Sequence, residues 1–123
     1  MKKILILIFT LIFFNSHAVE KSTNFTFEKF NKAQKEGKIV VVNSWNKTCS
    51  TCAKQVKILN DAEKKYSDII FLSFEQQNNE RIAKYLSIEY WTTIVIFKND
   101  KEIYRSIGQT DKAKIYSAIS SAT

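Results

Sequence analysis

The stretch IVVVNSWNKTCSTC, residues 39–52, decides how this chain folds, because it joins an apolar run to the only two cysteines. Residues 39–42 are continuously apolar and β-branched, which predicts a central strand covered on both faces. After the cysteines, apolar residues recur at helical spacing: Val56, Leu59, Ala62 and Tyr66. We therefore expect Cys49 at the start of a helix that runs to about residue 66, directly after the central strand.

The rest of the chain alternates helical and strand patterns around this unit. Gly37 is placed to end the first helix in a left-handed conformation, and Asn99-Asp100 is placed to make a hairpin turn. Thr110 or Asp111 is expected to cap the last helix. The predicted elements are a helix over 27–36, strands over 39–42 and 68–74, a helix around 82–86, strands over 93–97 and 102–107, and a helix carrying Ile115, Ile119 and Ala122. The order predicts a single α/β domain with its thiols at the carboxyl end of a central strand, where such sheets build sites.

The first eighteen residues have the pattern of a secretory signal peptide. Two lysines are followed by an apolar run over 4–14, and Ser16-His17-Ala18 places small residues where a signal peptidase would cut. The alternative is an uncleaved membrane tether, but the run is much shorter than the roughly 20 residues that span a bilayer. We expect cleavage after Ala18, a mature domain over 19–123, and a periplasmic or secreted location.

Composition excludes several classes of function. The chain carries 19 basic and 12 acidic residues, but the lysines are spread along it, so we expect no nucleic-acid partner. Its single histidine, His17, lies in the predicted signal peptide. A mature monomer therefore has no Cys-His pair, Ser-His-Asp triad or Cys/His zinc finger.

The spacing of Cys49 and Cys52 indicates thiol chemistry. The first turn of a helix offers unpaired N–H groups and the positive end of the helix dipole, which lowers the pKa of a thiol there. Cys49 would then attack a partner disulfide, and Cys52, one turn later and nearer the core, would release the partner. Two alternatives remain: a structural disulfide, which so short a ring makes weakly stabilising, and a clamp of two thiolates for a soft metal ion.

Over residues 25–122 the chain resembles the thioredoxin superfamily. The matching segments are IVVVNSWNKTCSTC and SIEYWTTIVIFKNDKEIYRSIG, residues 39–52 and 87–108. The resemblance implies a thioredoxin-like α/β fold, a central mixed sheet of about four to five strands flanked by helices on both faces. It also implies that Cys49 is the nucleophile, Cys52 the resolving thiol and Trp45 an aromatic residue flanking the site, with no cofactor.

Among the positions that depart from the family pattern, two bear directly on the chemistry of the cysteine pair. Thr92 stands where the family has a cis-proline, so we expect a trans peptide, altered geometry and a hydroxyl near Cys49. Asn43 stands where thioredoxins have a buried aspartate that assists the resolving thiol, so Cys52 is expected to react more slowly or through water. Trp91 precedes Thr92 and is interpreted either as a core aromatic or as a substrate-binding surface, to which Thr92 would also contribute.

The favoured interpretation is an exported thiol–disulfide oxidoreductase that acts as a monomer. A reductive role is favoured because CSTC lacks the histidine typical of strongly oxidising relatives. Such a role implies a membrane electron donor and cysteine-containing exported proteins as clients. The first alternative is a Cu(I)-type metal-binding or delivery module that uses both thiolates. The second is a redox-inactive binding protein.

Overall fold

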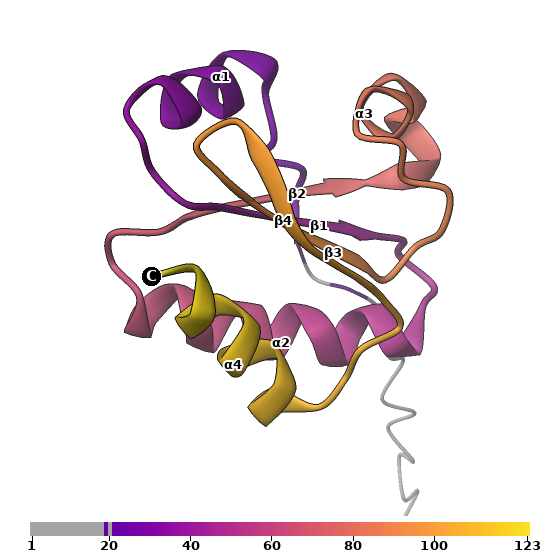
Figure 1. Ribbon diagram of the computed structural model, residues 1–123. Helices are drawn as coiled ribbons and strands as arrows, with labels where there is room; N and C mark the ends of the chain where they lie inside the picture. Colours follow the sequence, from indigo (N-terminus) through magenta and orange to yellow (C-terminus); the bar gives the residue numbers. More distant parts are fainter. Residues whose placement is uncertain (1–18, 20) are drawn as a thin grey trace, which may run out of the picture.

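The computed structural model describes Val19 and residues 21–123, so the predicted signal peptide lies outside the described residues. The described chain forms an α/β domain in the predicted order (Figure 1). Its elements are α1 (Phe27–Lys35), β1 (Val40–Trp45), α2 (Ser50–Lys65), β2 (Ile70–Glu75), a short 3₁₀ helix η1 (Gln76–Asn78), α3 (Glu80–Tyr85), β3 (Thr93–Lys98), β4 (Lys101–Ile107) and α4 (Lys112–Ala122).

The four strands form one mixed sheet in the order β2-β1-β3-β4. The central strand β1 pairs in parallel with β2 and antiparallel with β3, and β3 pairs antiparallel with β4. β1 is longer than predicted and includes the polar residues Asn43 and Ser44, both buried. Because these two side chains find hydrogen-bond partners in the interior, they continue the strand instead of ending it.

Helices cover both faces of the sheet, with α1 and α3 on one face and α2 and α4 on the other (Figure 1). Each face has its own apolar cluster, because successive strand residues point to opposite sides. Val40, Val42 and Val95 face α1 and α3, whereas Val41, Ile94 and Ile96 face α2 and α4. The valines and isoleucines of β1 and β3 thus hold the two layers together around the sheet.

Local signals fix the ends of the elements. Gly37 adopts a left-handed conformation after α1, and Asn99 and Asp100 do so between β3 and β4, as predicted. Of the two predicted caps for α4, Asp111 is the one used, and its carboxylate accepts a hydrogen bond from the Lys114 amide. No helix in the described part of the chain has the length and hydropathy needed to cross a membrane.

Candidate functional site

The two cysteines lie where β1 passes into α2. Cys49 is the N-cap of α2 and Cys52 lies in its first turn, with their Cα atoms 5.2 Å apart and their sulfurs joined in a disulfide. Cys49 is partly exposed, whereas Cys52 is 0% exposed. An incoming group can therefore reach the sulfur of Cys49 but not that of Cys52.

The sulfur of Cys49 accepts a hydrogen bond from the backbone amide of Cys52, with the nitrogen 3.1 Å from Sγ. This is the N-cap contact that a serine or aspartate oxygen makes at other helices. The first turn of α2 contains no acidic residue that would oppose a negative charge on this sulfur. The amide and the helix dipole thus both stabilise a thiolate at Cys49 relative to a thiol.

Cys52 faces a small apolar cluster on the inner side of α2. The cluster consists of Val19, Trp45, Cys52 and Val56, all buried, with Ala53 and Cys49 packed against it. Trp45, predicted to flank the site, is almost fully buried here and its Nε1 has no hydrogen-bond partner among the described residues. The amide of Val19 donates to the carbonyl of Lys47 at 3.2 Å, which fastens the start of the described chain to the loop before Cys49.

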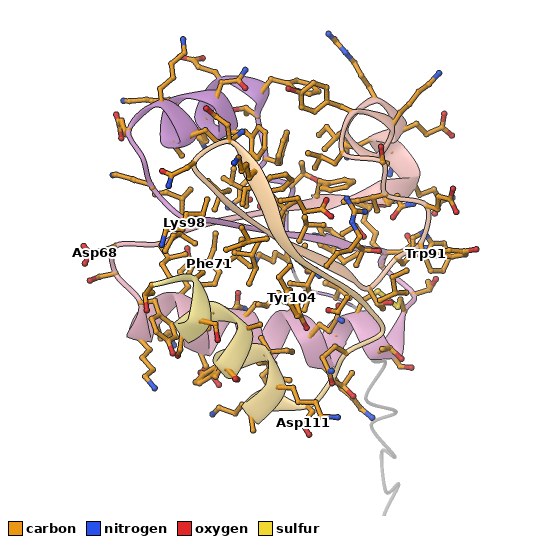
Figure 2. All side chains as sticks on the ribbon, viewed as in Figure 1. Asp68, Phe71, Trp91, Lys98, Tyr104 and Asp111 are labelled. Carbon is orange, nitrogen blue, oxygen red and sulfur yellow. A yellow bond between two sulfur atoms is a disulfide. The ribbon has the colours of Figure 1, made fainter. Side chains whose placement is uncertain are left out.

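A groove of about 700 Å³ opens beside Cys49. Its lining comes from α2, from the loop before β3 and from the end of β4: Cys49, Thr51, Glu89, Tyr90, Trp91, Thr92, Ile107 and Gly108. Tyr90, Trp91 and Ile107 are 59%, 44% and 58% exposed, and Figure 2 shows Trp91 projecting outward from the end of the molecule where α2 begins. Trp91 is therefore not a core aromatic, and the groove has an apolar rim.

Thr92 has the altered geometry predicted for a chain without the proline. The described residues contain no cis peptide bond, and Thr92 has a φ of +65°, in the left-handed region that β-branched residues rarely occupy. Its amide donates to the Ser44 carbonyl at 3.0 Å, and its carbonyl accepts from the Gly108 amide at 3.0 Å. Its hydroxyl donates to the Trp91 carbonyl, so this hydroxyl borders the groove but is already hydrogen-bonded within the loop.

Asn43 lies in a buried polar network beneath this loop. Its Nδ2 donates to the side-chain oxygen of Gln55 at 3.2 Å, and Nε2 of Gln55 donates to the carbonyls of Thr92 and Gln109 at 2.9 and 2.8 Å. Oδ1 of Asn43 has no partner within the described part of the chain. Neither amide can titrate, so this network contains no general base for Cys52.

Sequence reasoning did not identify Gln55. A signal was present, because Gln55 is a polar residue on the helix face that Cys52 and Leu59 share and is 0% exposed. A buried glutamine needs partners for its amide, and the structure provides them from two loops distant in sequence.

The charges near the thiols largely offset one another. Nζ of Lys47 lies 4.0 Å from a carboxylate oxygen of Glu75, and most of the lysine side chain is in solvent. Glu89 adds a carboxylate to the groove lining. Among the residues that the structure describes, no three histidine, cysteine, aspartate or glutamate side chains cluster as a metal site.

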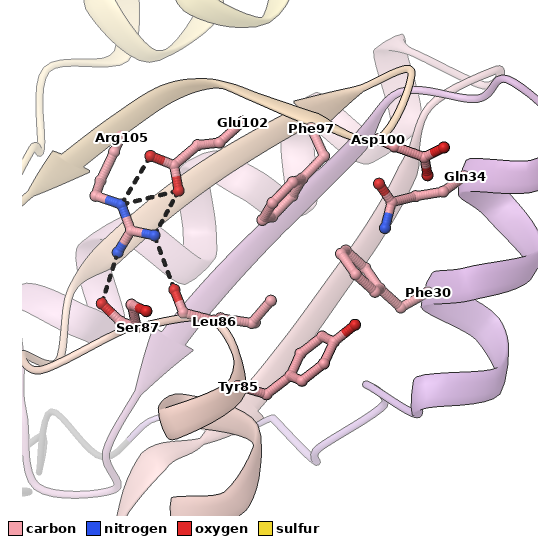
Figure 3. Close-up of a pocket in the computed structure, with 9 residues that line it drawn as sticks. All are labelled: Phe30, Gln34, Tyr85, Leu86, Ser87, Phe97, Asp100, Glu102 and Arg105. Carbon is pink, nitrogen blue, oxygen red and sulfur yellow. Dashed lines mark hydrogen bonds and ion pairs between the residues drawn. The ribbon is translucent and has the colours of Figure 1, made fainter.

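A second cavity of about 640 Å³ lies between α1, the end of α3 and the β3–β4 hairpin (Figure 3). Phe30, Tyr85 and Phe97 contribute aromatic walls, and Arg105 closes one side. The guanidinium of Arg105 donates to the carbonyls of Leu86 and Ser87 at 2.8 and 3.0 Å and pairs with Glu102. All three guanidinium nitrogens of Arg105 thus have partners within the protein.

Comparisons with known proteins agree with this geometry. The Thioredoxin family model matches residues 18–121. Thioredoxin H-type 1 of Nicotiana tabacum is 32% identical over 95 residues, which cover 77% of this chain and 72% of the tobacco protein.

Solved structures show the same fold. Trxlp of Edwardsiella tarda EIB202 superposes with a TM-score of 0.72 at 20% identity, covering 76% of this chain and 92% of that protein. Thioredoxin NaTrxh of Nicotiana alata superposes with a TM-score of 0.71 at 22% identity, covering 77% and 82% of the two chains. From the family match and the Cys49–Cys52 pair at the start of α2, we conclude that this chain belongs to the thioredoxin family and is a thiol–disulfide oxidoreductase.

Proposed function

We propose that this protein is an exported, monomeric oxidoreductase that reduces disulfides in other exported proteins. The observation that carries the proposal is the asymmetry of the cysteine pair. Cys49 is partly exposed and borders an apolar groove, and its sulfur accepts an amide N–H, while Cys52 is fully buried. This asymmetry assigns attack on the partner to Cys49 and release of the partner to Cys52.

The exchange proceeds in two balanced steps from the reduced protein. The Cys49 thiolate attacks one sulfur of the partner disulfide, a mixed disulfide forms, and the other partner sulfur leaves as a thiolate that takes up a proton. Cys52 then loses its proton and attacks Sγ of Cys49, which forms the intramolecular disulfide and expels the second partner thiolate. Two electrons pass from Cys49 and Cys52 to the partner.

The groove supports a polypeptide partner. Tyr90, Trp91 and Ile107 present apolar surface to solvent beside Cys49. A locally unfolded segment of a cysteine-containing protein would bury these side chains against its own apolar residues, at about 25 cal/mol per Å² of apolar surface. We therefore assign substrate binding to Trp91 and to the Thr92 loop.

Export is supported by the pattern of residues 1–18. Cleavage after Ala18 would leave the contacts of Val19 with Trp45, Cys52 and Lys47 in place. A reductant outside the cytoplasm needs a source of electrons, which we assign to a membrane donor. Amino-terminal sequencing of the exported protein should begin at Val19, and recovery of the intact precursor from the cytoplasm would contradict export.

Reduction of a model disulfide with dithiothreitol as electron source tests the activity. Cys49→Ser should lower the rate to that of dithiothreitol alone. Cys52→Ser should accumulate a mixed disulfide through Cys49. Ser117→Ala, a change at an exposed residue of α4 outside the groove lining, is the matched control and should keep the wild-type rate.

Two further outcomes would overturn the proposal in different ways. If the wild type does not turn over but binds one Cu(I) ion at the cysteine pair, the metal-binding alternative is correct. A measured reduction potential above that of its compartment would reverse the proposed direction, because the pair would then oxidise its clients.

A further inference from the structure

Gln55 connects the helix that carries the cysteines to the two other segments that line the groove. It lies three residues after Cys52 in α2 and is 0% exposed. Its Nε2 donates to the carbonyl of Thr92 at 2.9 Å and to the carbonyl of Gln109 at 2.8 Å. Thr92 and Gly108, the neighbour of Gln109, both line the groove and are joined by the hydrogen bond from the Gly108 amide to the Thr92 carbonyl. One side-chain amide thus fixes the separation of α2, which carries Cys49, from these two joined segments.

The direction of these hydrogen bonds explains why position 43 is an asparagine. Both N–H groups of Gln55 face carbonyls, so its Oε1 needs a donor. Nδ2 of Asn43 supplies that donor at 3.2 Å. An aspartate at this position would place one acceptor against another. The asparagine at position 43, where the family has an aspartate, is therefore coupled to Gln55. Through Gln55 it is also coupled to Thr92, which stands where the family has a proline.

The left-handed conformation of Thr92 depends on the same contacts. A β-branched residue keeps a left-handed backbone conformation only where several surrounding contacts hold it there. Gln55 and the Gly108 amide hold the Thr92 carbonyl, and the Ser44 carbonyl holds its amide. Without Gln55, the Thr92 carbonyl loses its only contact with α2 among these bonds.

We propose that Gln55 is a positioning residue that sets the width of the groove beside Cys49 and so determines how tightly a polypeptide disulfide binds. This inference rests on thiol–disulfide exchange at Cys49. A disulfide within an extended peptide must fit between Cys49 at the start of α2 and the joined segments that carry Thr92 and Gly108. A small disulfide reaches the sulfur of Cys49 without touching both sides.

The test compares Gln55→Met with Asn24→Leu. Each change removes an amide that bonds two backbone groups and keeps a similar side-chain volume. Asn24 bonds the Ser73 amide and the Phe71 carbonyl, away from the groove. Reduction of a cystine-containing peptide and of 5,5′-dithiobis(2-nitrobenzoate) is measured for both variants and the wild type.

Gln55→Met should raise KM for the peptide about tenfold, the effect of losing about one good hydrogen bond, with kcat changed less than about twofold. The rate with the small disulfide should stay at the wild-type level. Asn24→Leu should change neither substrate's constants. An unchanged peptide KM in Gln55→Met, or an equal loss with both substrates, would overturn the inference.

Amide hydrogen exchange gives a readout that needs no turnover. The Gly108 amide donates to the carbonyl that Gln55 holds. The hydrogen-exchange rate of this amide should rise about tenfold in Gln55→Met, because the loss of one hydrogen bond favours local opening of the loop. The rate should not change in Asn24→Leu. If the wild type lacks activity with both disulfides, the proposed function fails, while this exchange rate still decides whether Gln55 positions the loop.

Asn43→Leu provides a milder variant should Gln55→Met not fold. It leaves Oε1 of Gln55 without its donor, so the peptide KM should rise about threefold. Where both single variants fold, their effects on the peptide KM should be less than additive in the double variant, because both act through the hydrogen bond between Asn43 and Gln55. Part of the Asn43 effect should remain, because its Nδ2 also donates to the carbonyls of Ser44 and Thr93. A fully additive effect would contradict the coupling.

Discussion

Arg105 and Gln55 make the same arrangement in two different environments. Each planar group donates to two backbone carbonyls next to a left-handed residue, Ser87 for Arg105 and Thr92 for Gln55. Arg105 is charged, partly exposed and paired with Glu102 (Figure 3). Gln55 is neutral and fully buried, and its partner Asn43 is also neutral.

The difference follows from the cost of burying charge. A guanidinium at the surface keeps part of its hydration, so it can bind the end of α3 at little cost. A charge beneath the thiols would need full desolvation and a buried counter-ion. Two amides avoid that cost and also remain unchanged as pH varies. The interior of the redox site is therefore held by neutral amides, and the distal cavity by a charged pair.

The largest effect is expected from Gln55→Ala. It removes three hydrogen bonds of the interior, those of Gln55 with the carbonyls of Thr92 and Gln109 and with the amide of Asn43. Each lost bond costs about 1 kcal/mol and the space left by the side chain adds about 1 kcal/mol, so the free energy of unfolding should fall by about 4 kcal/mol. Urea denaturation of the oxidised protein measures this. A loss below about 1 kcal/mol would mean that water enters and replaces the amide, as at a surface site.

Thr92→Pro is expected to have the next largest effect. Proline requires a φ near −65° and has no N–H, whereas Thr92 has a φ of +65° and donates to Ser44. The free energy of unfolding should fall by about 3 kcal/mol. Thr92→Gly removes the strain of the left-handed threonine and should instead raise stability by about 0.5 kcal/mol. Thermal denaturation of both variants measures these two changes in stability, which should have opposite signs. If Thr92→Pro stabilised the protein, the left-handed conformation at position 92 would be disproved.

Arg105→Ala tests the exposed member of the comparison. Water can replace the guanidinium at the carbonyls of Leu86 and Ser87, so the free energy of unfolding should fall by only about 1.5 kcal/mol. This is well below the decrease expected for Gln55→Ala. Raising the salt concentration should reduce the difference in stability between this variant and the wild type, because salt screens the ion pair between Arg105 and Glu102. Denaturation at low and high salt measures both effects. An equal loss for the two alanine variants would remove the distinction between the sites.

Lys21 extends the comparison to a half-buried charge and should give the smallest effect. Burial lowers the pKa of Lys21 below its ordinary value of 10.5, and the nearby carboxylate of Glu63 partly offsets this. The folded state therefore disfavours the charged form, and wild-type stability rises with pH from the lowered folded pKa to the unfolded value. Lys21→Met should raise stability by about 0.5 kcal/mol at pH 7, with the gain fading by about pH 10.5. A gain that persists above that pH would exclude the charge as its cause.

The order of the elements could be predicted from the sequence because apolar periodicity carries it. The 39–42 run, the helical spacing after Cys52 and the Asn99-Asp100 turn each matched an element of the structure. The family match and the solved relatives confirmed the fold. These features depend on burial and local turn chemistry, which a sequence displays directly.

The polar interior could not be predicted in the same way. The predicted strand covers only the apolar run 39–42, so it leaves out Asn43 and Ser44. In the structure both residues are buried within β1, because Asn43 donates to Gln55, twelve residues later, and Ser44 donates to the Tyr90 carbonyl. Such pairings depend on which distant groups meet after folding, and no periodicity encodes them.

Under the proposed cleavage after Ala18, Val19 would be the first residue of the chain, and its position would link that cleavage to the chemistry of the site. Its side chain packs in the cluster that holds Trp45 and Cys52, and its amide bonds the loop before Cys49. A peptidase that removed Val19 as well would take away one member of the cluster around the resolving sulfur. Two proteoforms that differ by a single valine would then differ in how selectively oxidants and alkylating reagents distinguish the two thiols.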